Sequence, residues 1–235
     1  MKSLAFLLLA PSLAFASVGS VATLEGSANR TPKDGKPAAL AVGAEIDVGD
    51  VLEVGKGNLK LKLNDESVIM LGDSSRLTID EASFAGQERR GFAATLGLGK
   101  LWTKVSKAVG GAKFEVKTDK AVAGVRGTIF RIDSKTLLAA AGARKQAVTV
   151  VAVTEGLVGV TAKIKAAVPK AAPVKKGERK QVAGPSEISA EQWEEKFVQL
   201  QANMKVTIGE DLWQEARVEP ADTADAFAAF VKKNQ

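Results

Sequence analysis

The sequence predicts an all-β protein, built as a small β-solenoid or roll or as a sandwich of short strands, followed by an α-helical C-terminal tail. Three observations carry this prediction. Apolar and polar side chains alternate in short runs from Val18 to about residue 183, glycines and Asn/Asp/Ser clusters separate these runs, and after Ser186 the apolar spacing becomes helical. We therefore expect three parts: a signal peptide over 1–16, a β domain over 17–185 and an acidic helical tail over 186–235.

The first sixteen residues have the pattern of a secretory signal peptide. Lys2 supplies the positive start, residues 4–10 form a short apolar stretch, and Ala14-Phe15-Ala16 is a small-x-small cleavage site. The apolar stretch, interrupted by Pro11, is shorter than the roughly 18 residues that span a bilayer. The sequence predicts cleavage after Ala16 and a periplasmic or secreted protein without a transmembrane anchor.

The β domain shows its alternation most clearly where Leu59, Leu61 and Leu63 are interleaved with Lys60 and Lys62. One face of such a strand is apolar, and the other is polar and faces solvent. The same pattern predicts further strands at 67–71, 76–79, 101–105, 114–116, 128–132, 147–153 and 157–161.

The tail has apolar residues at helical spacing. The spacing predicts a first helix that contains Trp193, Phe197, Leu200 and Met204. A second helix is expected to begin near Asp222, with Phe227, Phe230 and Val231 on one face and Lys232 and Lys233 at its end. We expect this tail to fold back and bury Trp193, Phe197 and Leu200 against the β domain. The alternative is that the aromatic stripe binds a partner.

The composition excludes several kinds of chemistry. The chain contains no Cys, no His and no Tyr, so it has no disulfide, no Cys/His zinc site and no Ser-His-Asp triad. It also lacks a phosphate-binding loop and a dinucleotide fingerprint. We predict a protein that is not an enzyme and that needs no cofactor and no metal. A hydrolase that uses only carboxylates is an alternative.

Charge differs between the two mature parts of the chain. Residues 17–185 carry 27 basic and 17 acidic side chains, a net charge of +10, whereas residues 186–235 carry 5 and 10, a net charge of −5. The densest basic stretch is a candidate anion-binding surface made of Lys163, Lys165, Lys170, Lys175, Lys176, Arg179 and Lys180. A solvated loop and a docking surface for the acidic tail are the alternatives. Without interleaved aromatic residues for base stacking, the stretch does not predict nucleic-acid binding.

A series of motifs in the β domain resembles the FecR domain family in order and spacing. The most specific motif is Val125-Arg126-Gly127-Thr128-Ile129-Phe130, which follows the strand Phe114-Glu115-Val116-Lys117-Thr118; an earlier motif ends in Gly49-Asp50-Val51-Leu52, and another is Leu98-Gly99-Lys100-Leu101-Trp102. The resemblance covers about residues 18–183. The sequence departs from the family at two turns, where Asn64-Asp65-Glu66-Ser67 replaces Asp-Gly-Ser and Thr118-Asp119 replaces Thr-Pro.

The resemblance implies an all-β extracytoplasmic module that relays signals in the cell envelope. We interpret the family signature as mainly structural: Gly49, Asp50, Gly99, Arg126, Gly127, Thr128 and Phe130. Arg126 either caps backbone carbonyls at a corner or contacts a ligand. We expect an exported, non-catalytic binding or sensory module that recognises a protein or envelope ligand. The alternative is an envelope structural protein or one that adheres to polyanions or glycans.

Overall fold

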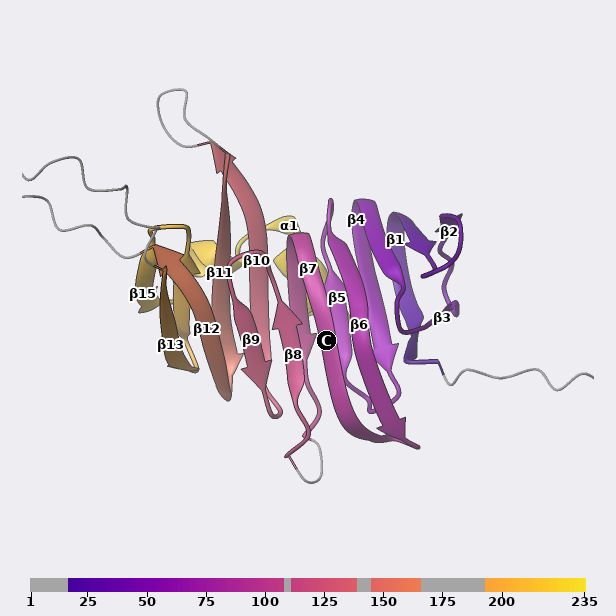
Figure 1. Ribbon diagram of the computed structural model, residues 1–235. Coiled ribbons are helices and arrows are strands. Elements are labelled where there is room, and N and C mark those ends of the chain that lie inside the picture. Colours follow the sequence, from indigo (N-terminus) through magenta and orange to yellow (C-terminus); the bar gives the residue numbers. More distant parts are fainter. Residues whose placement is uncertain (1–16, 108–110, 139–144, 166–192) are drawn as a thin grey trace, which may run out of the picture.

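The computed structural model describes residues 17–107, 111–138, 145–165 and 193–235, and it confirms the predicted all-β fold class (Figure 1). The predicted signal peptide and five residues of the candidate anion-binding surface, Lys170, Lys175, Lys176, Arg179 and Lys180, lie outside the described residues. The elements are β1 (Gly19–Thr31), β2 (Ala38–Ala39), β3 (Glu45–Ile46), β4 (Val51–Leu63), β5 (Val68–Leu71), β6 (Arg76–Ala85), β7 (Glu88–Lys104), β8 (Phe114–Lys117), β9 (Val122–Val125), β10 (Ile129–Leu138), β11 (Lys145–Glu155), β12 (Leu157–Lys165), β13 (Trp193–Gln201), β14 (Met204–Ile208), β15 (Trp213–Arg217), the 3-10 helix η2 (Pro220–Thr223) and α1 (Ala226–Asn234).

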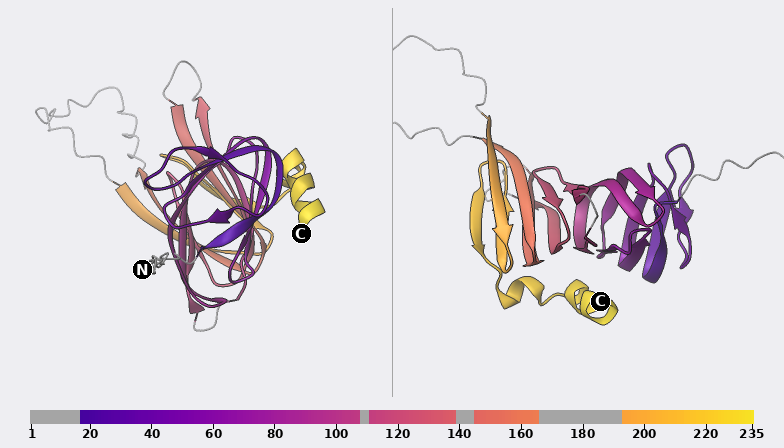
Figure 2. Two further views of the ribbon diagram at one scale, coloured as in Figure 1. Left: turned by 90° about the vertical axis from the view of Figure 1, so that its right-hand side faces the viewer. Right: turned by 90° about the horizontal axis from the view of Figure 1, so that it is seen from below.

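The strands form one continuous sheet that wraps around its own core as a flattened roll (Figure 2, left). One layer runs from the start of β4 through β6, the first part of β7, β8, β9 and β12 to β13. The other runs from β1 through the end of β4, β5, the last part of β7, β10 and β11 to β14 and β15. The long strands β1, β4 and β7 belong to both layers, since the end of β1 pairs with the start of β4.

Gly99 is the point at which β7 passes from one layer to the other. Its φ is +99°, and a Cβ at this position would lie 2.2 Å from Ser75 Oγ. Ser75 Oγ also accepts a hydrogen bond from the Lys100 N–H at 2.9 Å, which holds the neighbouring turn against the bend. Only glycine satisfies the backbone conformation and the close approach together.

The core lies between the layers and is filled by the apolar positions of the alternating runs. Leu59 and Leu61 are fully buried, whereas Lys62 between Leu61 and Leu63 points to solvent. One ion pair is also buried in this core: the Arg89 guanidinium contacts the Asp65 carboxylate and lies over the Phe114 ring. Such a pair stabilises only while both partners are present, because either charge alone would be buried without compensation.

Residues 193–204 do not form the predicted helix. They form β13, its turn and the start of β14, and β13 pairs with β12 in an unbroken antiparallel ladder from Trp193 to Gln201. The predicted burial is also wrong for two of three side chains: Leu200 is 1% exposed, but Trp193 is 48% and Phe197 68% exposed. A four-residue spacing is ambiguous because it places Trp193 and Phe197 on one face of a strand as well as of a helix.

The second predicted helix is present as α1. Asp225 is its N-cap and accepts a hydrogen bond from the Ala228 N–H at 2.9 Å. The helix lies on the outside of the roll (Figure 2, right), where Phe227, Phe230 and Val231 pack on Met70 and Trp102. No helix in the described part of the chain is long and apolar enough to cross a membrane.

Candidate functional site

The family signature forms a corner at which the chain passes from β9 in one layer to β10 in the other. Gly127 has a φ of +98°, and Thr128 and Phe130 are buried. The Thr128 hydroxyl donates a hydrogen bond to the Leu157 carbonyl at 3.0 Å, beside Gly156 in the turn from β11 to β12. The signature corner is thereby joined to a second corner between the same two layers.

The other signature residues lie in separate turns. Gly49, with a φ of +90°, precedes β4. The Asp50 carboxylate is buried, accepts a hydrogen bond from the Asp47 N–H at 2.7 Å and pairs with Arg30 Nε at 2.6 Å. These contacts hold the Asp47–Asp50 turn on β1, while Gly99 bends β7. The signature is therefore not gathered into a single pocket.

A shallow groove crosses the outer face of the sheet next to the signature corner. Four residues in register form its cross-strand row: Glu115 on β8, Gly124 on β9, Gly159 on β12 and Gln199 on β13. The two central glycines have no side chains, so the backbone of Gly124 and the Phe197 ring that lies over Gly159 form the floor of a groove of about 590 Å³. We call the outward side of β8, β9, β12 and β13 the groove face.

The walls of the groove combine charge with exposed apolar surface. Arg126 is exposed, and within the described residues its guanidinium makes no hydrogen bond or ion pair. Leu157 is 49% exposed, and Phe197 leans over Gly159. The Lys113 Nζ lies 3.8 Å from Glu115 Oε1. Because this ion pair is long, both groups stay solvated and able to contact a partner. The groove therefore offers an unpaired cation beside an aliphatic and an aromatic side chain.

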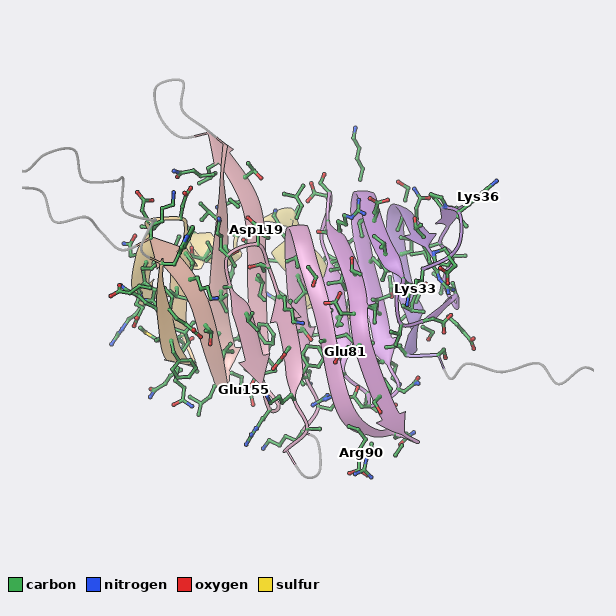
Figure 3. The ribbon with its side chains drawn as sticks, in the orientation of Figure 1. Lys33, Lys36, Glu81, Arg90, Asp119 and Glu155 are labelled. Atoms are coloured by element: carbon green, nitrogen blue, oxygen red, sulfur yellow. The ribbon has the colours of Figure 1, made fainter. Side chains whose placement is uncertain are left out.

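A second hollow of about 610 Å³ continues the groove face along β9, β12 and β13. Val122 and Trp193 contribute exposed apolar surface to it, and Lys163 and Glu195 contribute charge. Figure 3 labels a residue at either end of the groove face. Asp119 lines the second hollow, and Glu155 precedes Gly156, which lines the groove.

The two described lysines of the candidate anion-binding surface differ in their surroundings. Lys163 is exposed on the groove face. Lys165 forms an ion pair with Glu210, and its Nζ lies 5.6 Å from the centre of the Trp193 ring. In the described part of the chain, this surface is thus partly neutralised by the acidic tail.

Sequence reasoning identified Arg126 and the glycines but missed the groove face. Phe197 and Trp193 were expected to be buried, and Leu157 and Val122 were not singled out. The pattern of the sequence gives no signal for this face, because it depends on Gly124 and Gly159 lying directly opposite each other on two strands far apart in the chain. Among the described residues, no cluster of three or more His, Cys, Asp or Glu side chains is arranged to hold a metal ion.

Residues 50–159 match the model of the family described as FecR protein, so this part of the chain is a FecR domain. The family resemblance predicted from the motifs is confirmed over that range. Two crystal structures of a candidate anti-sigma factor from Parabacteroides distasonis are similar at 14% sequence identity, each with a TM-score of 0.46 over 72% of this chain and 60% of that chain. No curated protein sequence matches the chain.

Proposed function

We propose that this protein is an exported, non-catalytic sensory or binding module of the cell envelope that recognises a protein partner through the groove face. The presence of a FecR domain supports a sensory role, because the family that it resembles relays envelope signals. The pattern of the first sixteen residues supports export.

The observation that carries the proposal is Arg126, which is exposed at the groove without a partner among the described residues. An arginine that capped backbone carbonyls would be hydrogen-bonded in the free protein. An arginine beside exposed Leu157 and Phe197 has instead the composition of a binding hot spot, where aromatic residues and arginine contribute most of the free energy.

The groove also suits a protein partner by its shape. Its floor at Gly124 is backbone, so a partner segment can approach the sheet there more closely than it can over side chains, while the Phe197 ring covers Gly159 beside it. Its openness and its mixture of charged and apolar walls match a surface for a protein chain better than an enclosed site for a small molecule.

Partner capture from a cell-envelope extract tests the recognition surface. We expect the captured protein to be lost with Arg126→Ala and with Leu157→Ala, while the melting temperature of either variant stays unchanged, because both side chains are exposed. Arg90→Ala and Leu98→Ala are the matched controls: both are exposed and neither lines the groove. Equal capture by Arg126→Ala and Arg90→Ala would contradict the proposal.

Export is tested separately by the N-terminus of the native protein. We expect mass spectrometry of the protein isolated from its own cells to find Ser17 as the first residue, in a fraction outside the cytoplasm. A cytosolic species that retains Lys2 would show that the export part of the proposal is wrong.

A further inference from the structure

The C-terminal segment made of η2 and α1, which we call the strap, crosses the outer face of the second layer (Figure 2, right). Beneath it, neighbouring strands from β4 to β14 contribute a cross-strand row: Lys60, Met70, Trp102, Arg131, Ala152 and Lys205. The strap meets this row in order. Asp222 pairs with Lys205 at 2.7 Å at one end, and Asp225 pairs with Arg131 at 2.6 Å. At the other end, Lys60 Nζ donates a hydrogen bond to the Asn234 carbonyl at 2.5 Å.

Phe227 is the anchor of the strap and is 2% exposed. A Cβ on Gly72 would lie 3.1 Å from the Phe227 ring, so the ring fills a notch that the absent side chain leaves open. The Arg131 guanidinium lies 5.4 Å from the centre of the same ring and also pairs with Asp225. Asp133, on β10, pairs with Arg131 Nε at 2.7 Å and so holds the guanidinium in place. One arginine therefore contacts both side chains of an Asp-x-Phe sequence.

The strap is attached to the sheet without being part of it. No backbone–backbone hydrogen bond joins residues 220–235 to a described strand. The apolar residues of α1 form a cluster with Met70 and Trp102 that is separate from the core between the layers. The helix has nine residues, and isolated helices shorter than about 12 to 15 residues are marginal in water. Departure of the strap would therefore leave the sheet paired and the strap unfolded.

The face beneath the strap has the composition of a protein-binding site. Its apolar centre contains Trp102 and Met70, and Arg131 lies beside them; these residue types are enriched at interfaces. Cations border this centre. In the described part of the chain, the ion pairs of Lys100 and Lys205 are with carboxylates of the strap alone. Charge complementarity therefore favours an occupant that carries carboxylates at the start of a helix.

We infer that this face is a helix-binding site and that the strap is an autoinhibitory occupant, which a partner protein displaces with an amphipathic helix of the same chemistry. That helix begins with Asp-x-Phe and carries a second phenylalanine three residues later, because Asp225, Phe227 and Phe230 are the strap residues that contact Arg131, the Gly72 notch and the apolar centre. The tethered strap lowers the apparent affinity of the partner by the fraction of molecules whose face is covered. The site lies on the other layer from the groove face, so it is independent of recognition at Arg126.

Peptide exchange on the full chain from Ser17 to Gln235 tests the strap. The probe is a fluorescein-labelled synthetic peptide of residues 219–235, and fluorescence anisotropy measures its binding. We expect Phe230→Ala, which weakens the strap and leaves the face unchanged, to bind the peptide about tenfold or more tightly than the wild type does. Lys232→Ala, on the exposed side of α1, is the matched control and should behave as the wild type. Equal binding by the wild type and Phe230→Ala, or binding to neither, would overturn the inference.

A second set of variants tests the face itself. Gly72→Val, added to Phe230→Ala, should abolish peptide binding because it fills the notch that receives Phe227. Gly97→Val in the same background is the control, since a Cβ there would lie 4.0 Å from its nearest neighbour. Circular dichroism shows whether each variant is folded. Retained binding by the Gly72→Val protein would place the peptide elsewhere and contradict the site.

Peptide variants test the chemistry of the partner without altering the protein. The peptide with Phe227→Ala should lose binding to the Phe230→Ala protein. A designed helix that keeps only the Asp-x-Phe-x-x-Phe pattern should compete with the labelled peptide for that protein. If the designed helix does not compete, or if the Phe227→Ala peptide binds as well as the original, the inferred pattern of recognition is wrong.

Discussion

Gly127 combines two constraints, as the other signature glycines Gly49 and Gly99 also do. Its φ of +98° lies in a region that side chains with a Cβ rarely adopt, and a Cβ would lie 2.6 Å from Lys107 Cγ and 3.3 Å from Lys107 Cα. The contact with a flexible side chain can relax, but the backbone strain cannot. The structural role of this residue therefore rests first on its backbone conformation.

Gly127→Val should lower the free energy of unfolding by about 1 to 3 kcal/mol, with a further loss if Lys107 cannot move aside. Urea denaturation followed by circular dichroism measures the change. Gly97→Val is the control. Gly97 lies in β7 without a positive φ, and a Cβ there would lie 4.0 Å from its nearest neighbour, the Arg76 carbonyl oxygen. Equal stability of the two variants would show that the corner tolerates a side chain.

At the scale of elements, α1 is attached to the roll by packing and by one carboxylate. Asp225 pairs with Arg131 at 2.6 Å and with Lys100 at 2.9 Å, so a residue of the acidic tail meets two cations of the β domain. Partial burial alone would raise the pKa of the Asp225 carboxyl, but hydrogen bonds from Arg131, Lys100 and the Ala228 N–H hold this pKa well below its ordinary value. The helix is therefore fixed most firmly while Asp225 is ionised.

The attachment of α1 should weaken in acid. Because the pKa of Asp225 is lower in the folded state than in the unfolded chain, its contribution is complete above the unfolded value of about 4 and is lost as the pH falls toward the folded value. Asp225→Asn retains an N-cap but removes the charge, and it should cost roughly 1 to 2 kcal/mol at pH 7.

Urea denaturation at pH 7, 4 and 3 checks this prediction. The difference in stability between the wild type and Asp225→Asn should shrink as the pH falls. Asp73→Asn, which removes an exposed carboxylate, should show no such convergence. A constant difference between wild type and Asp225→Asn at all three pH values would mean that the ion pairs contribute nothing to the attachment.

At the scale of the whole molecule, residues 193–217 complete the roll. β13 extends one layer beyond β12, and β14 with β15 extends the other beyond β11. Leu200, Val206 and Ile208 are nearly or fully buried in the common core. The acidic residues of this part act mainly at the surface, as in the pair between Glu210 and Lys165.

Truncation at two points should separate the contributions of the tail. Ending the chain after Pro185 removes six buried apolar side chains, worth roughly 1.5 to 3 kcal/mol each, and exposes the edges of β12 and β11. We expect this variant to aggregate. Ending it after Val218 removes only η2 and α1 and uncovers Met70 and Trp102, so the roll should remain folded with a lower melting temperature.

Light scattering and thermal unfolding measure both effects. Raising the salt concentration alone should not mimic either truncation, because apolar burial contributes more than exposed ion pairs. A soluble Pro185 truncation that melts at the wild-type temperature would show that the tail is energetically independent of the β domain.

The alternation of apolar residues was enough to predict most strands of the β domain, because a strand with one buried face must repeat with period two whatever it pairs with. The run around Leu59, the strand at Phe114 and the strand after Thr128 are all found where the sequence predicts them. The motifs also identified the FecR domain, and Asp225 with its apolar face was sufficient to predict α1, since caps and helical spacing are local signals.

Tertiary structure decided what local pattern leaves ambiguous. Residues 193–201 have a spacing that fits a helix or a strand, and the ladder with β12 makes them a strand. The same ladder leaves Phe197 exposed, and the register that sets Gly124 opposite Gly159 creates the groove beside Arg126. The sequence by itself determined the strands and the family, because those depend on nearby residues. The candidate site depends on which distant strands become neighbours, and only pairing across the whole sheet fixes that.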